Sequence, residues 1–323
     1  MADLSTLLLE KLARAWQVYV DSLPALAQNF GWVLLFTALV MLMEWALVDR
    51  KRTSLARILG FSGSVRNDLT AAALKFTGLN AYVGMALTFG VAYLIAKSLR
   101  SAAAGWDITH YLSPTAAGLA FFLLADFTHY WFHRASHSWR IHWSIHKFHH
   151  SANQMTLANA YREHPLGAPL GSIWIIFPFT LAPPPDYLGA LLLASLLIQL
   201  HGLITHSNIP AAWGPIGNYL LVSPATHRMH HGRAEELHNS NYGGTLIIWD
   251  RLFGTWQPPK GLDIAGLAIG LDDDPGDIPP LQAYHRAYLE TLRNFRTTLQ
   301  SFGRAMLSRP CLSVHQKPEK ERP

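Results

Sequence analysis

The sequence predicts an all-α protein, an integral membrane helical bundle of about four to five membrane-embedded helices with a histidine-rich cap on the cytoplasmic side. Three observations support this fold class. Hydrophobic residues make up 50% of the 323 residues and charged residues only 15%, whereas a soluble chain is about a quarter charged. Several apolar stretches approach the length of a bilayer core. Finally, 14 of the 17 histidines lie between His129 and His238.

Five apolar stretches are the candidate membrane helices, at 31–48, 78–96, 114–131, 167–182 and 187–205. Each can span most of a bilayer core at about 1.5 Å per residue. Three consecutive prolines and an aspartate at 183–186 separate the last two, and consecutive prolines cannot continue a helix. The last two stretches therefore predict a helical hairpin.

The short basic loops predict the orientation of the bundle. The positive-inside rule assigns the loop after the first stretch to the cytoplasm. The residues that carry this assignment are Arg50, Lys51, Arg52, Arg57 and Arg66. Lys97 and Arg100 in the next loop conflict mildly with it. The histidines then fall on the cytoplasmic side, and the residues before the first stretch are expected to form an interfacial amphipathic helix.

Histidines recur with helical spacing in three groups. HYWFH and HRASH place His129, His133 and His137 four residues apart, and HKFHH and HRMHH share the pattern HxxHH. A lone histidine is most often a packing residue, but imidazoles packed side by side leave nitrogens unsatisfied unless something binds them. Neutral imidazole is a good transition-metal ligand, and the number of histidines favours two ions that share the patch.

Four further histidines are weaker candidates. His206 ends the returning hairpin helix and can face the clusters. His164 and His201 are as well explained by roles behind the ligands or in packing, and His129 depends on which HxxxH pattern is used. The single cysteine, Cys311, excludes a cysteine metal cage or an internal disulfide.

Other metal chemistries fit the pattern less well. The zinc-hydrolase motif HExxH is absent, the only Glu-x-x-His pair is Glu235 with His238, and haem binding would use single axial histidines. A membrane metal-binding or metal-transport protein that uses the histidine patch stays open as the alternative. Basic charge lies in juxtamembrane loops, which suits lipid headgroups and not nucleic acid.

HRASH, HKFHH and HRMHH resemble the three histidine boxes of the fatty acid hydroxylase and sterol desaturase superfamily of membrane di-iron oxygenases. The flanking sequences DFTHYW, REHP, THSNI and NSNYGGTLIIWDRLFGTW look similar as well, and the likeness extends over 121–256. The first box of the family matches HRASH, so His129 becomes a candidate only. By position, the resemblance implies that the catalytic metal ligands are His133, His137, His146, His149, His150, His227, His230 and His231, with His206 as a further metal ligand.

The resemblance also implies an activity and its partners. It implies two iron ions in a di-iron centre, O2 as co-substrate, and hydroxylation or desaturation of a lipid such as a sterol or a fatty acyl lipid. The chain has no haem-domain, flavin or ferredoxin motif, so we expect electrons from a separate cytoplasmic donor.

The chain is expected to divide into three parts. Residues 1–113 would hold the interfacial helix and first membrane helices, 114–257 the hydroxylase-like catalytic domain, and 258–323 a loop, an amphipathic helix at 283–308 and a charged tail. Asp126 is expected to accept a hydrogen bond from a ligand imidazole or to pair with an arginine. Gly243 and Gly244 predict a tight turn, and Asp250 with Arg251 an ion pair or a cap.

Overall fold

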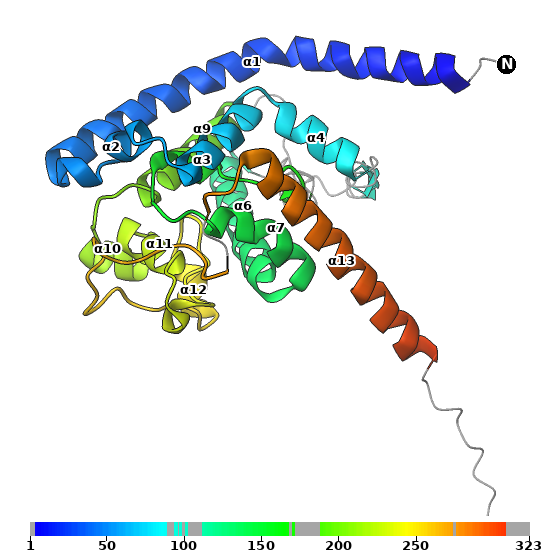
Figure 1. The fold of residues 1–323 in the computed structure, drawn as a ribbon. Helices are drawn as coiled ribbons and strands as arrows, with labels where there is room; N and C mark the ends of the chain where they lie inside the picture. The colour runs from blue at the N-terminus through cyan, green and yellow to red at the C-terminus, as the bar shows by residue number, and fades with distance from the viewer. Residues whose placement is uncertain are drawn as a thin grey trace, which may run out of the picture.

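The computed structural model describes residues 4–88, 94–95, 97–98, 101–102, 112–167, 170–171, 188–273 and 276–307. Within these residues the regular elements are helices, accompanied by two isolated antiparallel bridges, Leu221 with Leu246 and Gly232 with Ile269. The predicted all-α class is therefore confirmed. The α-helices, drawn in Figure 1, are α1 (Leu4–Leu47), α2 (Ser54–Leu59), α3 (Gly63–Phe76), α4 (Leu79–Leu87), α6 (Pro114–Ser138), α7 (Arg140–His150), α9 (Leu188–Thr205), α10 (Gly214–Tyr219), α11 (Pro224–His230), α12 (Ile248–Leu252) and α13 (Pro280–Leu307). The 3₁₀ helices are η1 (Arg50–Arg52), η3 (Leu157–Tyr161) and η5 (Glu235–Leu237).

The first element is one continuous helix of 44 residues with Pro24 inside it. The sequence predicts a separate interfacial helix ahead of the first apolar stretch, but the structure joins the two into α1, which runs along one edge of the molecule (Figure 1). Pro24 removes only one backbone hydrogen bond, and strong helix formers such as Ala25 and Leu26 follow it. The helix therefore continues through Pro24 into the first apolar stretch.

The membrane-spanning potential is clearest in α1. Within the described ranges one helical segment, Leu26–Leu47, is long and apolar enough to cross a membrane, and Leu193–Thr205 is a shorter apolar helix. Helix α4 covers the start of the stretch at 78–96, while most of the stretch at 167–182 and the proline-rich turn after it lie outside the described residues. Four to five membrane helices remain a prediction.

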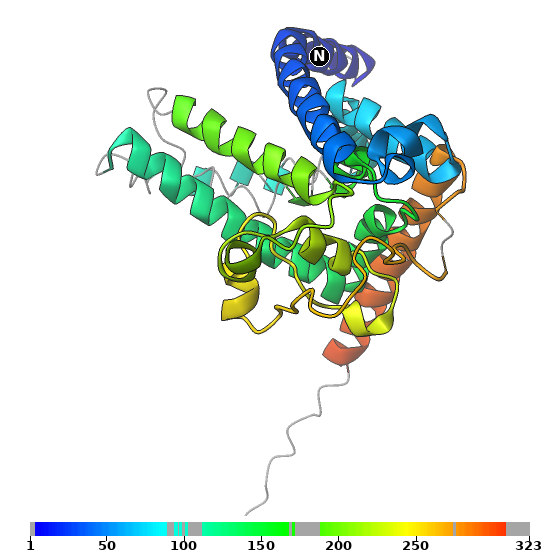
Figure 2. The same cartoon turned by 90° about the vertical axis from the view of Figure 1, so that its left-hand side faces the viewer.

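Helices α6, α7 and α11 carry the histidine boxes, and α9 packs on α6 and on α11. The Ser113 hydroxyl caps α6 by accepting a hydrogen bond from the backbone N–H of Ala116 at 3.3 Å, and Pro114 occupies the first turn. Trp139 adopts an extended conformation between α6 and α7, so α7 folds back onto the end of α6. Figure 2 shows α9 lying beside α6, with which it packs.

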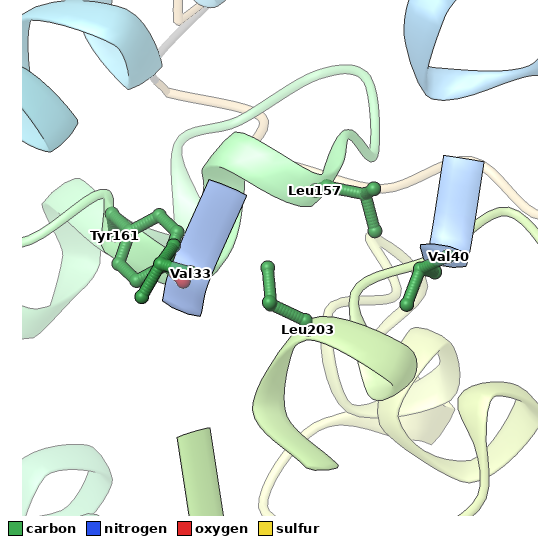
Figure 3. Close-up of a cluster of buried hydrophobic side chains, with 5 residues drawn as sticks. All are labelled: Val33, Val40, Leu157, Tyr161 and Leu203. Atoms are coloured by element: carbon green, nitrogen blue, oxygen red, sulfur yellow. The ribbon is translucent and has the colours of Figure 1, made fainter. Parts of the chain in front are cut away.

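A small apolar core joins α1 to η3 and α9. Val33 and Val40 of α1 meet Leu157 and Tyr161 of η3 and Leu203 of α9, as Figure 3 shows. All five side chains are buried, so the second half of α1 is fixed to η3 and α9.

Helix α13 packs on α7 through its first half. Ala283 and Ala287 are buried, the hydroxyls of Ser144 and Thr291 lie 3.0 Å apart, and Lys147 forms an ion pair with Glu290. The amphipathic helix predicted at 283–308 is thus α13, and one of its faces packs on α7. The lone Cys311 and the predicted charged tail lie outside the described residues.

Candidate metal centre

The structure gathers nine histidines into two compact groups, and these nine are the ones that the family resemblance implies as metal ligands. Within each group, one nitrogen from every ring lies within 4.8 Å of the others. We name them the first group, His133, His137, His146, His150 and His230, and the second group, His149, His206, His227 and His231.

Helix periodicity explains how the boxes divide between the groups. Residues four apart on a helix are offset by about 40°, while residues three apart are offset by about 60° in the opposite sense. His146 and His150 therefore stay together in the first group, whereas His149 turns to the second. In the third box the relation is reversed, because His227 and His231 enter the second group and His230 enters the first. Each HxxHH box thus serves both groups.

The two groups adjoin, and nitrogens face one another within each. The rings of His150 and His231, from different groups, stack with centroids 4.4 Å apart. The Nε2 atoms of His206 and His227 are 3.0 Å apart, and those of His146 and His150 are 3.2 Å apart. Two nitrogens bound at about 2.1 Å to one ion at right angles lie about 3 Å apart. The spacing therefore fits a shared cation.

Burial keeps these imidazoles neutral. Loss of hydration, followed by repulsion from neighbouring imidazolium charges, lowers the pKa of His133 and His146 well below the usual 6.5. Burial also lowers the pKa of His206 and His230 to about 4. Among the residues that the structure describes, the buried Nε2 atoms of His133, His137 and His230 have no hydrogen-bond partner. A neutral, nitrogen-rich donor set of this kind fits first-row transition metals such as iron and zinc.

Backbone carbonyls orient three of the rings. The Nδ1 atom lies 2.7–2.8 Å from a carbonyl oxygen in three pairs, His133 with Tyr242, His206 with Gly202 and His230 with Ser240. A carbonyl oxygen can only accept, so Nδ1 donates its proton to it and the Nε2 lone pair is directed into the group.

Comparison with known proteins then identifies the family. The fatty acid hydroxylase family matches residues 118–255, which contain all nine histidines. The chain belongs to the fatty acid hydroxylase and sterol desaturase superfamily.

The relatives within this superfamily are lipid-modifying oxidoreductases. The alkylglycerol monooxygenase of Xenopus tropicalis is 37% identical over 147 residues, 45% of this chain and 32% of that protein. The ornithine lipid hydroxylase OlsE of Rhizobium tropici is 34% identical over 42% of this chain and 40% of its own length. A Delta(7)-sterol 5(6)-desaturase of Aspergillus fumigatus is 33% identical over 43% and 37%, respectively. The chain thus covers less than half of each of these relatives, and no solved structure matches it.

In this superfamily member, Asp250 organises the segment that supplies two of the orienting carbonyls. Its buried carboxylate accepts hydrogen bonds from the backbone N–H groups of Tyr242 and Gly243 and from the Thr255 hydroxyl, each at 2.7 Å. The expected pair between Asp250 and Arg251 is wrong, because the Arg251 guanidinium instead lies over two aromatic rings. The Asp250 carboxylate therefore holds the backbone at Tyr242, whose carbonyl oxygen accepts the hydrogen bond from His133.

The two glycines of this segment serve close packing. Neither Gly243 nor Gly244 has a positive φ, so neither uses the left-handed backbone that favours glycine. A Cβ on Gly244 would lie 2.5 Å from Nδ1 of His129, and a Cβ on Gly243 would lie 2.6 Å from the carbonyl oxygen of Leu246. Glycine therefore lets this segment approach α6 and its own backbone.

Asp126 on α6 anchors the same segment. Its carboxylate accepts hydrogen bonds from the backbone N–H of Thr245 at 2.8 Å, the N–H of Leu246 at 3.1 Å and the Trp249 indole at 2.8 Å. Both expected partners, a ligand imidazole and an arginine, are wrong. The loop presents backbone donors that must be satisfied once they are buried against α6.

A buried ion pair behind the second box escaped the sequence analysis. Arg162 donates to the Phe148 carbonyl at 2.8 Å and to the Ser151 hydroxyl at 2.7 Å, and pairs with Asp68 of α3 at 2.9 Å. Both charged side chains are almost completely buried. Arg162 belongs to the REHP segment that resembles the family. It is separated from Asp68 by 94 residues, however, and the spacing of residues along a helix or strand cannot predict a contact over that distance.

A second buried acid supports the residues after His206. The Glu44 carboxylate of α1 accepts hydrogen bonds from the Asn208 backbone N–H at 2.7 Å and from the Ser54 hydroxyl at 2.8 Å. Asn208 in turn accepts a hydrogen bond from Arg228 at 3.2 Å. The apolar helix α1 thus carries one acid that reaches the neighbourhood of the second group.

The remaining candidate histidines are not in either group. His164 donates from Nε2 to the Tyr284 carbonyl at 2.9 Å, and its Nδ1 accepts from the Leu166 backbone N–H at 3.1 Å. Both ring nitrogens are used, so none is left for a metal. His129 and His201 also lie outside both groups.

Proposed function

We propose that the chain is a membrane-bound di-iron oxygenase that uses O2 and electrons from a separate donor protein to hydroxylate or desaturate a lipid. The observation that carries this proposal is the pair of adjoining imidazole groups, each of which is suited to one ion. The relatives, named as monooxygenase, hydroxylase and desaturase, favour iron over zinc for these groups.

Bound iron would supply the oxidising power that an unactivated C–H bond requires. The residues of the chain would hold the two ions through the nine imidazoles and orient the rings through the carbonyls of Gly202, Ser240 and Tyr242. The buried ion pair of Arg162 with Asp68 would keep the second box in place, and burial of the rings would limit access of water.

A lipid is the substrate class that the relatives share by name, since they act on alkylglycerols, an ornithine lipid and a sterol. We propose that the chain lies in a membrane through its apolar helices, with the histidine boxes on the cytoplasmic side, where a soluble donor reaches them. Because the relatives are matched over less than half of their length, the individual lipid is best found by assay.

The test uses purified full-length protein. We expect about two irons per chain and, with a reductant and O2, a product that has gained one oxygen or lost two hydrogens from one lipid in a panel of alkylglycerols, ornithine lipids, sterols and fatty acids. The relatives do not favour the metal-transport alternative. Stoichiometric zinc that crosses proteoliposomes, with no oxidised lipid, would contradict the proposal.

A further inference from the structure

An apolar groove lies between α1, α3 and η3, and none of its lining residues belongs to either histidine group. Its volume is about 730 Å³, within the range of about 300–1,000 Å³ that is usual for small-molecule sites. The walls are formed almost wholly by apolar side chains, including Leu26, Phe30 and Val33 of α1 and Ala73 and Phe76 of α3. The groove is therefore separate from the metal centre and suited to hydrocarbon.

The groove is elongated along α1. Its lining residues on this helix extend from Tyr19 to Met41, which is about 33 Å at 1.5 Å per residue. Tyr161 lies beside Val33, and from Val33 to Tyr19 the groove runs about 21 Å, which accommodates an extended acyl or alkyl chain, whereas a compact ligand would leave much of it unfilled.

The same part of α1 gives access from a lipid phase. The groove is lined by Phe30 and Leu34, which keep 39% and 51% of their surface exposed, and both belong to Leu26–Leu47, the segment able to cross a membrane. A ligand that reaches the groove along this surface passes over apolar side chains. A membrane lipid can reach the groove in this way, because it already lies beside a segment that can cross the membrane.

A polar group in the wall indicates that the ligand carries oxygen. The Tyr161 side chain lines the groove and is 7% exposed, and its hydroxyl has no hydrogen-bond partner within the described residues. The Lys75 ammonium lies 5.6 Å from the centre of the Tyr161 ring and forms an ion pair with Glu163. A buried hydroxyl without a partner is costly, and an ester, ether or carboxyl oxygen would satisfy it.

We propose that this groove binds the hydrocarbon chain of a membrane lipid, with the oxygen-bearing end of that lipid at Tyr161 and Lys75. The site is an accessory one, distinct from the reaction centre. It adjoins the second box through η3, because Tyr161 is followed by Arg162, which binds the Phe148 carbonyl at the end of α7.

The test uses the iron-loaded full chain and a palmitic acid analogue with a mid-chain diazirine and a terminal alkyne. After irradiation, peptide mass spectrometry should place the label on α1 and α3 at groove residues. Ala73→Trp, which fills the groove from an exposed position, should reduce this labelling several-fold. Ala46→Trp, on an exposed position of α1 outside the groove, is the matched control and should not.

A second variant tests the polar end. Tyr161→Phe keeps the ring against Phe76 and should weaken binding of the fatty acid analogue about three- to tenfold, while leaving an alkane analogue of equal length unaffected. Iron content and thermal midpoint report whether each variant is folded. Labels spread evenly over the outer face of α1 in the wild-type protein, or an equal loss of both analogues in Tyr161→Phe, would overturn the proposal.

Discussion

At the residue scale, three ligands of the proposed centre, His133, His206 and His230, are each oriented by a hydrogen bond from Nδ1 to a backbone carbonyl. In His133 and His230, Nδ1 is bound to a carbonyl and Nε2 is directed into the first group. The family resemblance carried by the three boxes and their flanking sequences implied all nine members. It did not indicate how the nine divide, which becomes evident only when His149 is seen to turn away from His146 and His150.

Removing one ring from either group should empty the centre. We expect His230→Ala, in the first group, and His149→Ala, in the second, each to lower metal affinity and activity by more than about a hundredfold, since even residues behind the ligands contribute ten- to a hundredfold. Iron content and product formation are the measurements. His285→Ala, at an exposed position, is the control. Full activity in His230→Ala would refute the assignment.

The choice between the overlapping HxxxH patterns has its own test. His129 lies outside both groups, while His137 is a member of the first. We expect His137→Ala to lose iron and activity, and His129→Ala to keep its iron. If His129→Ala were iron-free and His137→Ala were active, the first box would be HYWFH, with His129 and His133 as its ligands, and not HRASH.

At the scale of elements, the boxes are held by partners remote in sequence. Asp126 of α6 binds backbone 119 and 120 residues away, and Arg162 binds Asp68 across 94 residues. Helix spacing predicts neighbours within one element, so box membership was accessible from sequence. Contacts between elements depend on the packing of the whole fold, and the expected partners of Asp126 and Asp250 were wrong for that reason.

Asp250 offers a test of the orienting segment. Asp250→Asn removes one of the two acceptor oxygens and should lower iron affinity about ten- to a hundredfold, because the Tyr242 carbonyl that orients His133 is then less firmly held. Iron titration by absorbance is the measurement. Asp263→Asn, in a surface loop where the carboxylate accepts a hydrogen bond from Gly266, is the matched control. Equal affinities in the two variants would argue against this role.

The buried ion pair between Arg162 and Asp68, behind the second box, offers a test of how the boxes are held in place. Arg162→Leu should lower the free energy of unfolding by about 3–5 kcal/mol, because it leaves the Asp68 carboxylate buried without its partner. In the Arg162→Leu/Asp68→Leu double variant we expect part of that loss to be recovered. Thermal unfolding of the two proteins checks this, and a double variant less stable than the single one would contradict it.

At the scale of the whole molecule, the helical class was accessible from composition and apolar runs, whereas the course of α1 was not. A separate interfacial helix was expected ahead of the first membrane helix, but α1 is one continuous helix, and its Val33 and Val40 pack on η3 and α9. The division into parts at 113 and 257 remains a prediction.

Burial of many neutral histidines makes stability depend on pH. The pKa of His164, His206 and His230 is lowered to about 4 in the folded chain, so below about 6.5 the unfolded chain binds more protons than the folded one. The free energy of unfolding of the iron-free protein should therefore fall as the pH drops from about 6.5 towards 4. Each such group contributes a loss of about 1.4 kcal/mol at pH 5.5. Thermal midpoints between pH 7.5 and 5 test this, and a flat profile would contradict it.

The way in which both HxxHH boxes serve both groups has a consequence for how the protein acquires its metals. Filling one group immobilises α7 and α11, and these two short helices also carry ligands of the other group. The conformational entropy of ordering them is then lost once, with the first ion, so the second ion binds more tightly. We expect loading to be cooperative: titration should pass from empty to doubly loaded chains with few singly loaded ones. A defect in one group should then cost the protein both ions.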